Sequence, residues 1–166
     1  VIHAMTHPEH EVTIAMVALE QPEKHPADVS PQRTKGYLAA MDEAGLSDSA
    51  RVFYFPQPEM SRNRAVHDIL RHPDRPRSVF CWSDIDAIPL VSAAHELGLR
   101  IPGDLAVIGY DNSPVAGLPQ VGLTSVDQDG RTLGRMAAEA LLSRIGGRKE
   151  PQRMLLDPTL IVRRSI

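Results

Sequence analysis

Apolar residues along this chain gather in short, almost continuous runs, which alternate with segments of helical spacing. Nearly uninterrupted runs of this kind are typical of strands covered on both faces. The runs predict four strands, at 10–19, 50–56, 77–84 and 103–111. Between them, apolar residues recur every three or four positions, which predicts helices at 32–46, 61–73 and 84–99.

Strands that alternate with amphipathic helices indicate crossover units. The predicted fold is therefore α/β, a doubly wound parallel sheet with helices on both faces. After Asp111 the alternation of strands and helices ends, and the pattern predicts a short extended segment at 121–129 and a helix at 132–147. One face of that helix is apolar, at Leu133, Met136, Ala137, Ala140, Leu141 and Ile145. The last residues, 153–166, predict a hairpin-like pair of short strands with Asp157-Pro158 as the turn.

Length and composition fit one globular domain. The chain has 166 residues, of which 42% are hydrophobic and 23% charged, both ordinary values. The formal charge is −3 and the basic residues are scattered, so no surface for phosphate neutralisation is predicted. No apolar run reaches the about 18 residues of a membrane span. The single Cys81 lies in a predicted buried strand and is interpreted as a structural thiol, in keeping with a reducing compartment.

Motifs for catalysis and cofactor binding are missing. The chain has no G-x-S-x-G elbow, no P-loop and no G-x-G-x-x-G after a strand. His3, His7 and His10 have spacings that a metal could use, but their segment is rich in Thr, Pro and Glu, which favours an ordinary polar segment. We expect no catalytic residues, no metal and no cofactor.

Two Asp-x-Asp pairs have two interpretations. Asp84 with Asp86, and Asp127 with Asp129, could hold Mg²⁺ on a loop. Each pair, however, stands where a predicted helix begins, so helix capping and the helix dipole explain the carboxylates without a metal. Capping is the favoured interpretation.

Polar side chains follow the predicted strands at the edge where an open α/β sheet binds ligands. Arg33 lies early in its helix, an unfavourable end for a cation, so it is either a solvated surface arginine or one with an anionic or hydroxyl partner. Asp111 directly follows an apolar strand, so we expect it to be partly buried and to need loop amides or a ligand as partners. With Gln57, Ser83 and Trp82, this set suits a polyhydroxylated or planar ligand.

Several ordered motifs resemble one family. The segments that carry the resemblance are Arg33 to Tyr37, Ser83-Asp84, Gly98 to Asp104, Gly109-Tyr110-Asp111-Asn112, Leu123 to Gln128, Leu133-Gly134 and Leu160 to Ser165. Together they resemble the effector-binding region of the LacI/GalR family of bacterial transcription regulators, over nearly the whole chain.

The resemblance implies a domain organisation. Residues 1–126 and 151–166 would form the second of two similar subdomains, in the manner of type I periplasmic binding proteins. Residues 127–150 would carry a helix that packs on a first subdomain absent from this sequence, as is the helix-turn-helix that reads DNA. Homodimer contact is expected at the apolar face of helix 84–99 and at the loop "SPVAGLP". The alternative for that helix face is burial against its own sheet, and part of the face must be buried in this way.

The resemblance also implies site residues. Arg33 and Asp111 match positions that grip the effector, Ser83 and Gln128 match positions that often line its pocket, and Gln57 stands where many members carry a stacking aromatic. Ser83 replaces the usual Asn, which removes an amide donor and acceptor. Pro89 stands where the family usually has Gly, so we expect its helix to start late or to kink.

The implied function is that of a cytoplasmic ligand sensor. A small effector, by default a sugar or sugar phosphate and otherwise a nucleoside or nucleobase, would control the affinity of a dimer for operator DNA. A sugar-binding protein of a transport system shares the expected fold and is the alternative. An α/β enzyme that uses Asp84 and Asp111 as acid and base is a further alternative, but it lacks a nucleophile or metal in the sequence.

Overall fold

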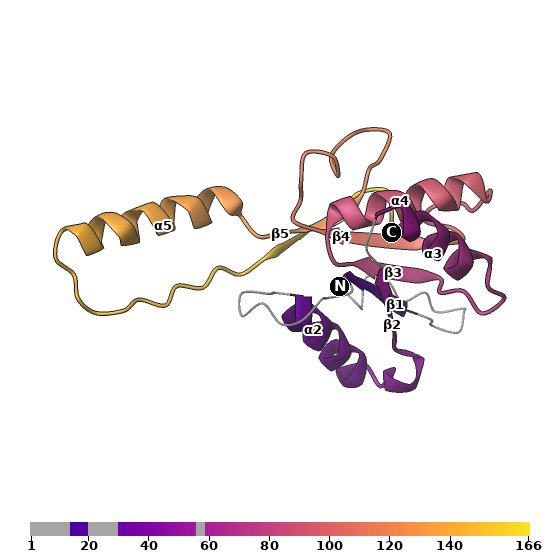
Figure 1. Cartoon of the computed structure of the whole chain (residues 1–166), viewed down its shortest axis with the longest axis horizontal. Helices are drawn as coiled ribbons and strands as arrows, with labels where there is room; N and C mark the ends of the chain where they lie inside the picture. The colour runs from indigo at the N-terminus through magenta and orange to yellow at the C-terminus, as the bar shows by residue number, and fades with distance from the viewer. Residues whose placement is uncertain (1–13, 20–29, 56–58) are drawn as a thin grey trace.

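The computed structural model describes residues 14–19, 30–55 and 59–166, which form a sheet body and a projecting arm (Figure 1). Six strands make one sheet, in the order β2-β1-β3-β4-β5-β6. The strands are β1 (Ile14–Leu19), β2 (Arg51–Phe55), β3 (Ser78–Cys81), β4 (Ala106–Tyr110), β5 (Thr124–Asp127) and β6 (Thr159–Ile161). The helices are α2 (Ser30–Glu43), α3 (Glu59–Arg71), α4 (Asp84–Glu96) and α5 (Gly130–Ile145), with a short 3-10 turn, η1, at Ser47–Ser49.

The sheet confirms the predicted doubly wound α/β fold. β1 to β5 pair in parallel and only β6 runs antiparallel. The chain goes from β1 outward to β2 and then returns to β3 on the other side of β1. The carboxyl ends of β1 and β3 therefore flank the point where the strand order reverses, which is where open α/β sheets bind ligands.

Alternating strand residues divide the core into two layers. On one face Val17, Val79 and Val107 pack with the buried residues of α3 and α4. On the other face Met16 and Ile108 pack with residues of α2, among them Tyr37 and Met41. Successive side chains of a strand point to opposite faces, so the nearly continuous apolar runs supply both layers.

Helix α4 begins at Asp84 and contains Pro89, so the expected late start is wrong. On its apolar face, Ala87, Leu90, Val91 and Ala94 are buried against the protein's own sheet and α3, as the alternative to a dimer contact expects. Ile85 points the other way and is 67% exposed. A partner could therefore reach only the outward side of this helix.

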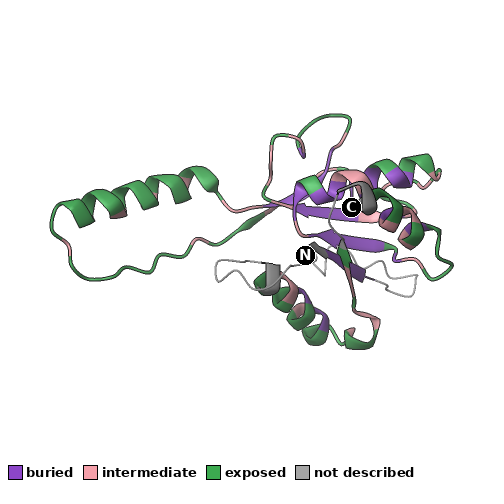
Figure 2. Ribbon diagram, viewed as in Figure 1, coloured by how far each residue is buried: buried purple, intermediate pink, exposed green. Residues whose placement is uncertain are grey.

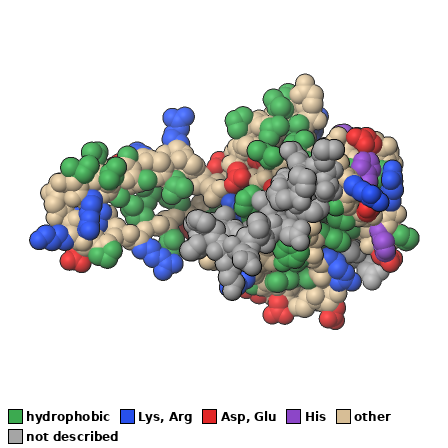
Figure 3. Space-filling view, viewed as in Figure 1, with side chains coloured by type: hydrophobic (Ala, Val, Ile, Leu, Met, Phe, Trp, Pro, Cys, Tyr) green, Lys and Arg blue, Asp and Glu red, His purple; other side chains and the backbone are tan. Residues whose placement is uncertain are grey.

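The arm consists of α5 and the extended segment that returns to β6 (Figures 1 and 2). No residue of α5 is buried, and Leu142 and Ile145 are 67% and 74% exposed. Figure 3 shows apolar side chains along the arm, interspersed with Lys and Arg. The predicted terminal hairpin is wrong. Residues 153–157 form no strand, since they are mostly exposed and bury no face against the sheet, and only β6 joins it, antiparallel to β5.

Cys81 is fully buried and free, as predicted for a structural thiol. Burial raises the pKa of this thiol well above its ordinary value, and the nearby charges of Asp86 and Asp84 raise it further. Within the part of the chain that the structure describes, no helix is long and apolar enough to cross a membrane.

Candidate functional site

Arg33 reaches from the first turn of α2 to the carboxyl ends of β3 and β4. Its guanidinium carbon lies 3.9 Å from the centre of the Tyr110 ring and 4.9 Å from that of Trp82. Nη1 donates a 2.6 Å hydrogen bond to the carbonyl oxygen of Trp82. The side chain is only 13% exposed. Two aromatic rings and a carbonyl thus hold the cation in one orientation.

Asp111 is the anionic partner of Arg33. Oδ1 of Asp111 lies 3.4 Å from Nη2 of Arg33 and accepts a 2.6 Å hydrogen bond from Nε2 of Gln128. With 41% of its side chain exposed, Asp111 is partly buried, and the partners of its carboxylate here are side chains rather than loop amides. The structure therefore brings together three of the predicted effector residues, from α2, the loop after β4 and the segment after β5.

This cluster offers several groups to a ligand. The carboxylate of Asp111 has further acceptor sites, the guanidinium of Arg33 has further donors, and the amide oxygen of Gln128 is an acceptor. The cluster lies beside the point where the strand order reverses, at the end of β3 and β4. It can therefore bind hydroxyl, amide or ring N–H groups in a fixed orientation.

Ser83 directs its hydroxyl into a helix cap. Oγ accepts from the backbone N–H of Asp86 at 3.2 Å and donates to Oδ2 of Asp86 at 2.6 Å. The residue is only 6% exposed. Both directions of hydrogen bonding are thus used within the N-terminus of α4, and a contact of Ser83 with an effector stays a prediction. Gln57 and the histidines His3, His7 and His10 lie outside the described residues.

The capping part of the interpretation of the Asp-x-Asp pairs is confirmed for Asp129 and wrong for Asp84, which nevertheless lies in the first turn of α4, as the helix-dipole part expects. Asp129 is the N-cap of α5 and accepts from the backbone N–H of Thr132 at 3.1 Å. The carboxylate of Asp84 accepts instead from the hydroxyls of Ser113 and Ser125, at 2.8 Å and 2.6 Å. Among the described residues, no three His, Cys, Asp or Glu side chains lie close enough together to hold a metal.

The contact of Tyr110 with Arg33 was not predicted from the sequence. Its ring covers the guanidinium of Arg33 and also packs at 6.3 Å, centre to centre, on Phe80. An aromatic residue just before a candidate carboxylate was the available signal. Trp82, which the sequence did indicate, keeps its Nε1 buried without a hydrogen-bond partner among the described residues.

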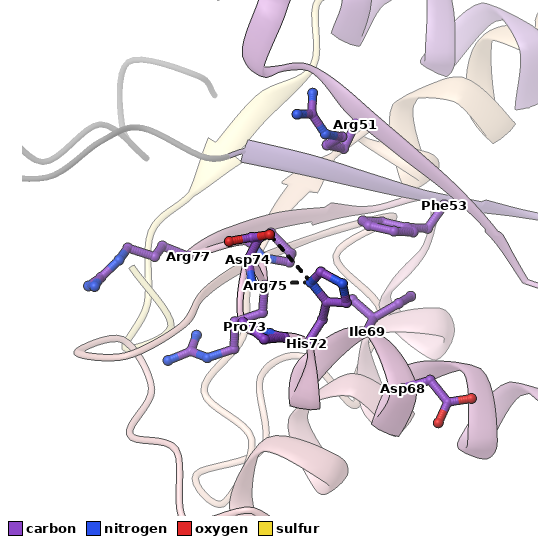
Figure 4. A pocket seen from close by; sticks show the side chains of 10 residues that line it. Arg51, Phe53, Asp68, Ile69, His72, Pro73, Asp74, Arg75 and Arg77 are labelled. Atoms are coloured by element: carbon purple, nitrogen blue, oxygen red, sulfur yellow. Dashed lines mark hydrogen bonds and ion pairs between the residues drawn. The ribbon is translucent and has the colours of Figure 1, made fainter.

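A hollow of about 790 Å³ lies away from this cluster, at the opposite edge of the sheet, where β2 and β3 begin (Figure 4). Arginine side chains and His72 line it together with Phe53 and two aspartates. The backbone N–H of Asp74 donates to Nδ1 of His72, and Arg75 donates to the carbonyl oxygen of Asp104. None of the predicted effector residues that the structure describes lines this hollow.

Comparison with known proteins supplies the family. Residues 10–166 match the periplasmic binding protein-like domain. The chain belongs to that family. Among curated proteins, the HTH-type transcriptional repressor PurR of Serratia proteamaculans is 42% identical to this chain over 137 residues. That match covers 81% of this chain and 40% of the repressor, so the chain spans less than half the length of this relative.

Solved structures agree with this assignment. A LacI transcriptional regulator from a Rhodococcus species has a TM-score of 0.80 at 31% identity, over 92% of this chain and 55% of that one. A LacI family regulator from Enterococcus faecium, solved with bound ribose, has a TM-score of 0.80 at 27% identity, over 99% and 58%. The resemblance of the domain to the effector-binding region of LacI/GalR regulators is thereby confirmed.

Proposed function

We propose that this chain is the effector-sensing part of a LacI-type transcriptional regulator. The observation that carries the proposal is the cluster of Arg33, Asp111 and Gln128, which converge from distant parts of the chain at the ligand-binding edge of the sheet. A small molecule bound there would change the affinity of the complete protein for operator DNA.

The exposed arm supports a second subdomain as the other wall of the site. A helix of this length with exposed Leu141, Leu142 and Ile145 leaves apolar area in water, which is unfavourable unless another surface covers it. We assign residues 1–126 and 151–166 to one subdomain and the arm, 127–150, to the contact with another. Gln128, at the root of the arm, would then face both the ligand and the junction.

The effector is proposed to be a sugar or sugar phosphate, or alternatively a nucleoside or nucleobase. Carboxylate, guanidinium and amide groups suit ring hydroxyls, and the relative from Enterococcus faecium holds ribose. The rings of Trp82 and Tyr110 beside the cluster suit a planar base equally well. Both classes need a hydrogen-bond acceptor at Asp111.

The complete protein is proposed to be a cytoplasmic homodimer that binds operator DNA through a part outside this chain. Symmetric half-sites require two DNA-reading heads. The relatives named above are transcriptional regulators, and this favours a regulator over a transport component or an enzyme. An enzyme that used Asp84 as a catalytic acid is disfavoured further, since this carboxylate is 1% exposed and bound to Ser113 and Ser125.

A thermal-shift screen of the complete protein against sugars, sugar phosphates, nucleosides and nucleobases tests the proposal. A ligand at about 100 times its dissociation constant stabilises the folded state by roughly 2.7 kcal/mol. Calorimetry on a hit should then show that Arg33→Ala weakens binding by about 2 kcal/mol, and that Asp111→Asn also weakens it, because each removes a charged hydrogen-bond partner.

Arg100→Ala is the matched control, since Arg100 is an exposed arginine of the sheet body, away from the arm, that pairs with Asp104. Its effector affinity should equal that of the parent. Binding that survives Arg33→Ala and Asp111→Asn unchanged would contradict the assigned site, and a folded protein that answers to no compound would contradict the effector class.

A further inference from the structure

The loop after β4 is held in an unfavourable backbone conformation. Asp111 and Asn112 both have positive φ angles, 99° and 45°, which non-glycine residues adopt at a cost. The first three amides of the loop are each fixed by a different group. The N–H groups of Asp111, Asn112 and Ser113 donate to the carbonyl oxygen of Val126, to Oγ of Ser125 and to Oδ2 of Asp84, at 2.9, 3.0 and 2.6 Å.

The side chain of Asn112 joins this loop to both strands at the root of the arm. Nδ2 donates to Oδ2 of Asp127 at 3.0 Å, and Oδ1 accepts from Nη2 of Arg163 at 2.6 Å. Asp127 ends β5, through which the chain enters the arm, and Arg163 follows β6, through which it returns. The side-chain amide of Asn112 thus contacts both the segment that leads into the arm and the segment that returns from it.

The two contacts need both halves of an amide. Asp127 requires a donor and Arg163 requires an acceptor, and a primary amide supplies one of each. Both bonds involve a charged partner in a partly buried place, so each is stronger than a neutral pair. A carboxylate at position 112 would keep Arg163 but face the charge of Asp127.

Neighbouring residues of the loop hold neighbouring residues of the arm root. Asp111 contacts Gln128 at 2.6 Å, and Asn112 contacts Asp127. The residue that would meet the effector and the residue that fixes the arm are therefore adjacent in the chain. A shift of the Asp111 backbone would be transmitted to the Asn112 amide.

We propose that Asn112 is a positioning residue that couples the loop after β4, which carries Asp111, to the arm through Asp127 and Arg163. The inference rests on the proposed function for the role of Asp111, but the contacts themselves involve no ligand. A ligand that favours one position of the loop would select the matching position of the arm.

Hydrogen exchange of the complete protein tests the arm side of this coupling. In Asn112→Asp, amides in 123–130 and 158–164 should exchange about tenfold faster than in the parent, because loss of a charge-assisted bond favours local opening. Adding Asp127→Asn should restore slow hydrogen exchange, since the amide of residue 127 can then donate to the carboxylate of residue 112. Oδ1 of residue 127 can keep the bond that it accepts from the Asp129 N–H.

Trp82 provides a second readout at the effector side, because it is the only tryptophan of these 166 residues and contacts Arg33. The difference between each variant and the same variant with Trp82→Phe isolates its signal in the complete protein. Acrylamide quenching of its fluorescence should rise in Asn112→Asp and return to the parent value in the exchanged pair. Asn112→Gly, which fits the positive φ angle, should also speed exchange at the arm root. Asn63→Asp, an exposed change of the same chemistry on α3, should alter neither readout.

Unchanged exchange in Asn112→Asp, or no recovery in the exchanged pair, would overturn the positioning role. Neither readout uses an effector or DNA, so such a failure would leave the effector screen unaffected. Conversely, a protein that binds no effector could still show faster hydrogen exchange in Asn112→Asp and its recovery when Asp127→Asn is added.

Discussion

Asp84 and Gly109 show how single residues fix the geometry beneath the candidate site. The buried carboxylate of Asp84 binds Ser113, in the loop after β4, and Ser125, in β5. A Cβ at Gly109 would collide with Oδ1 of Asp84 and would lie 2.8 Å from Cδ2 of Leu123. Position 109 therefore has no room for a side chain, because Asp84 must reach across it.

We expect Gly109→Ala to destabilise the fold by about 1–3 kcal/mol, since the new methyl group would have to displace a buried, hydrogen-bonded carboxylate. Denaturant unfolding measures this. Gly36→Ala is the control, because no described atom outside the neighbouring residues and the helix's own backbone lies within 4 Å of a Cβ at that exposed position of α2. It should stabilise slightly. Equal stabilities for the two variants would show that Asp84 moves aside without cost.

At the scale of the element, the N-terminus of α5 depends on a carboxylate that titrates. Asp129 caps the helix, and its hydrogen bonds to Thr132 hold its pKa below the ordinary value. A lowered pKa in the folded state means that the cap contributes above the unfolded pKa of about 3.9. The contribution is lost as the pH falls through the folded pKa.

The amide protection of Thr132 should therefore decrease when the pH is lowered from about 5 to about 2. Asparagine is as good an N-cap as aspartate and does not titrate in this range, so Asp129→Asn should remove the pH dependence while keeping the helix start. Protection factors from nuclear magnetic resonance measure both. A pH-independent amide in the parent would show that the carboxylate does not cap the helix in solution.

At the scale of the whole molecule, the sheet body and the arm differ in what stabilises them. The body buries two apolar layers, one on each face of the sheet. The arm buries nothing of α5, although several of its apolar residues lie at helical spacing. An amphipathic helix gains most of its stability from packing its apolar face, so the arm is predicted to depend on a surface outside this chain.

Ile145→Glu should change the unfolding free energy of this 166-residue chain by less than about 0.5 kcal/mol, because Ile145 is 74% exposed. In the complete protein the same change should be clearly destabilising, since it would place a charge in the proposed junction. Leu90→Ala is the reference and should cost about 2–5 kcal/mol in both, because Leu90 is fully buried. A silent Ile145→Glu in the complete protein would contradict the proposed packing of the arm.

The sequence by itself determined the strands of the body, the helices and the edge of the sheet that carries polar groups. These follow from local periodicity. A strand covered on both faces is apolar at nearly every position, whereas a helix buried on one face has apolar residues every three or four positions. Tertiary structure decided which side chains meet. Arg33 and Asp111 are 78 positions apart, and only the order of the strands brings them together.

Tertiary contacts also decided what each polar group is free to do. The hydroxyl of Ser83 is used in a cap and the carboxylate of Asp84 in a buried cluster, although both follow the same strand as candidate site residues. The last segment forms one strand instead of a hairpin, because β6 pairs with the edge of β5 whereas the mostly exposed residues 153–157 have no surface on which to pack. Hydrogen-bond partners depend on distances between remote segments, and local sequence patterns do not encode those distances.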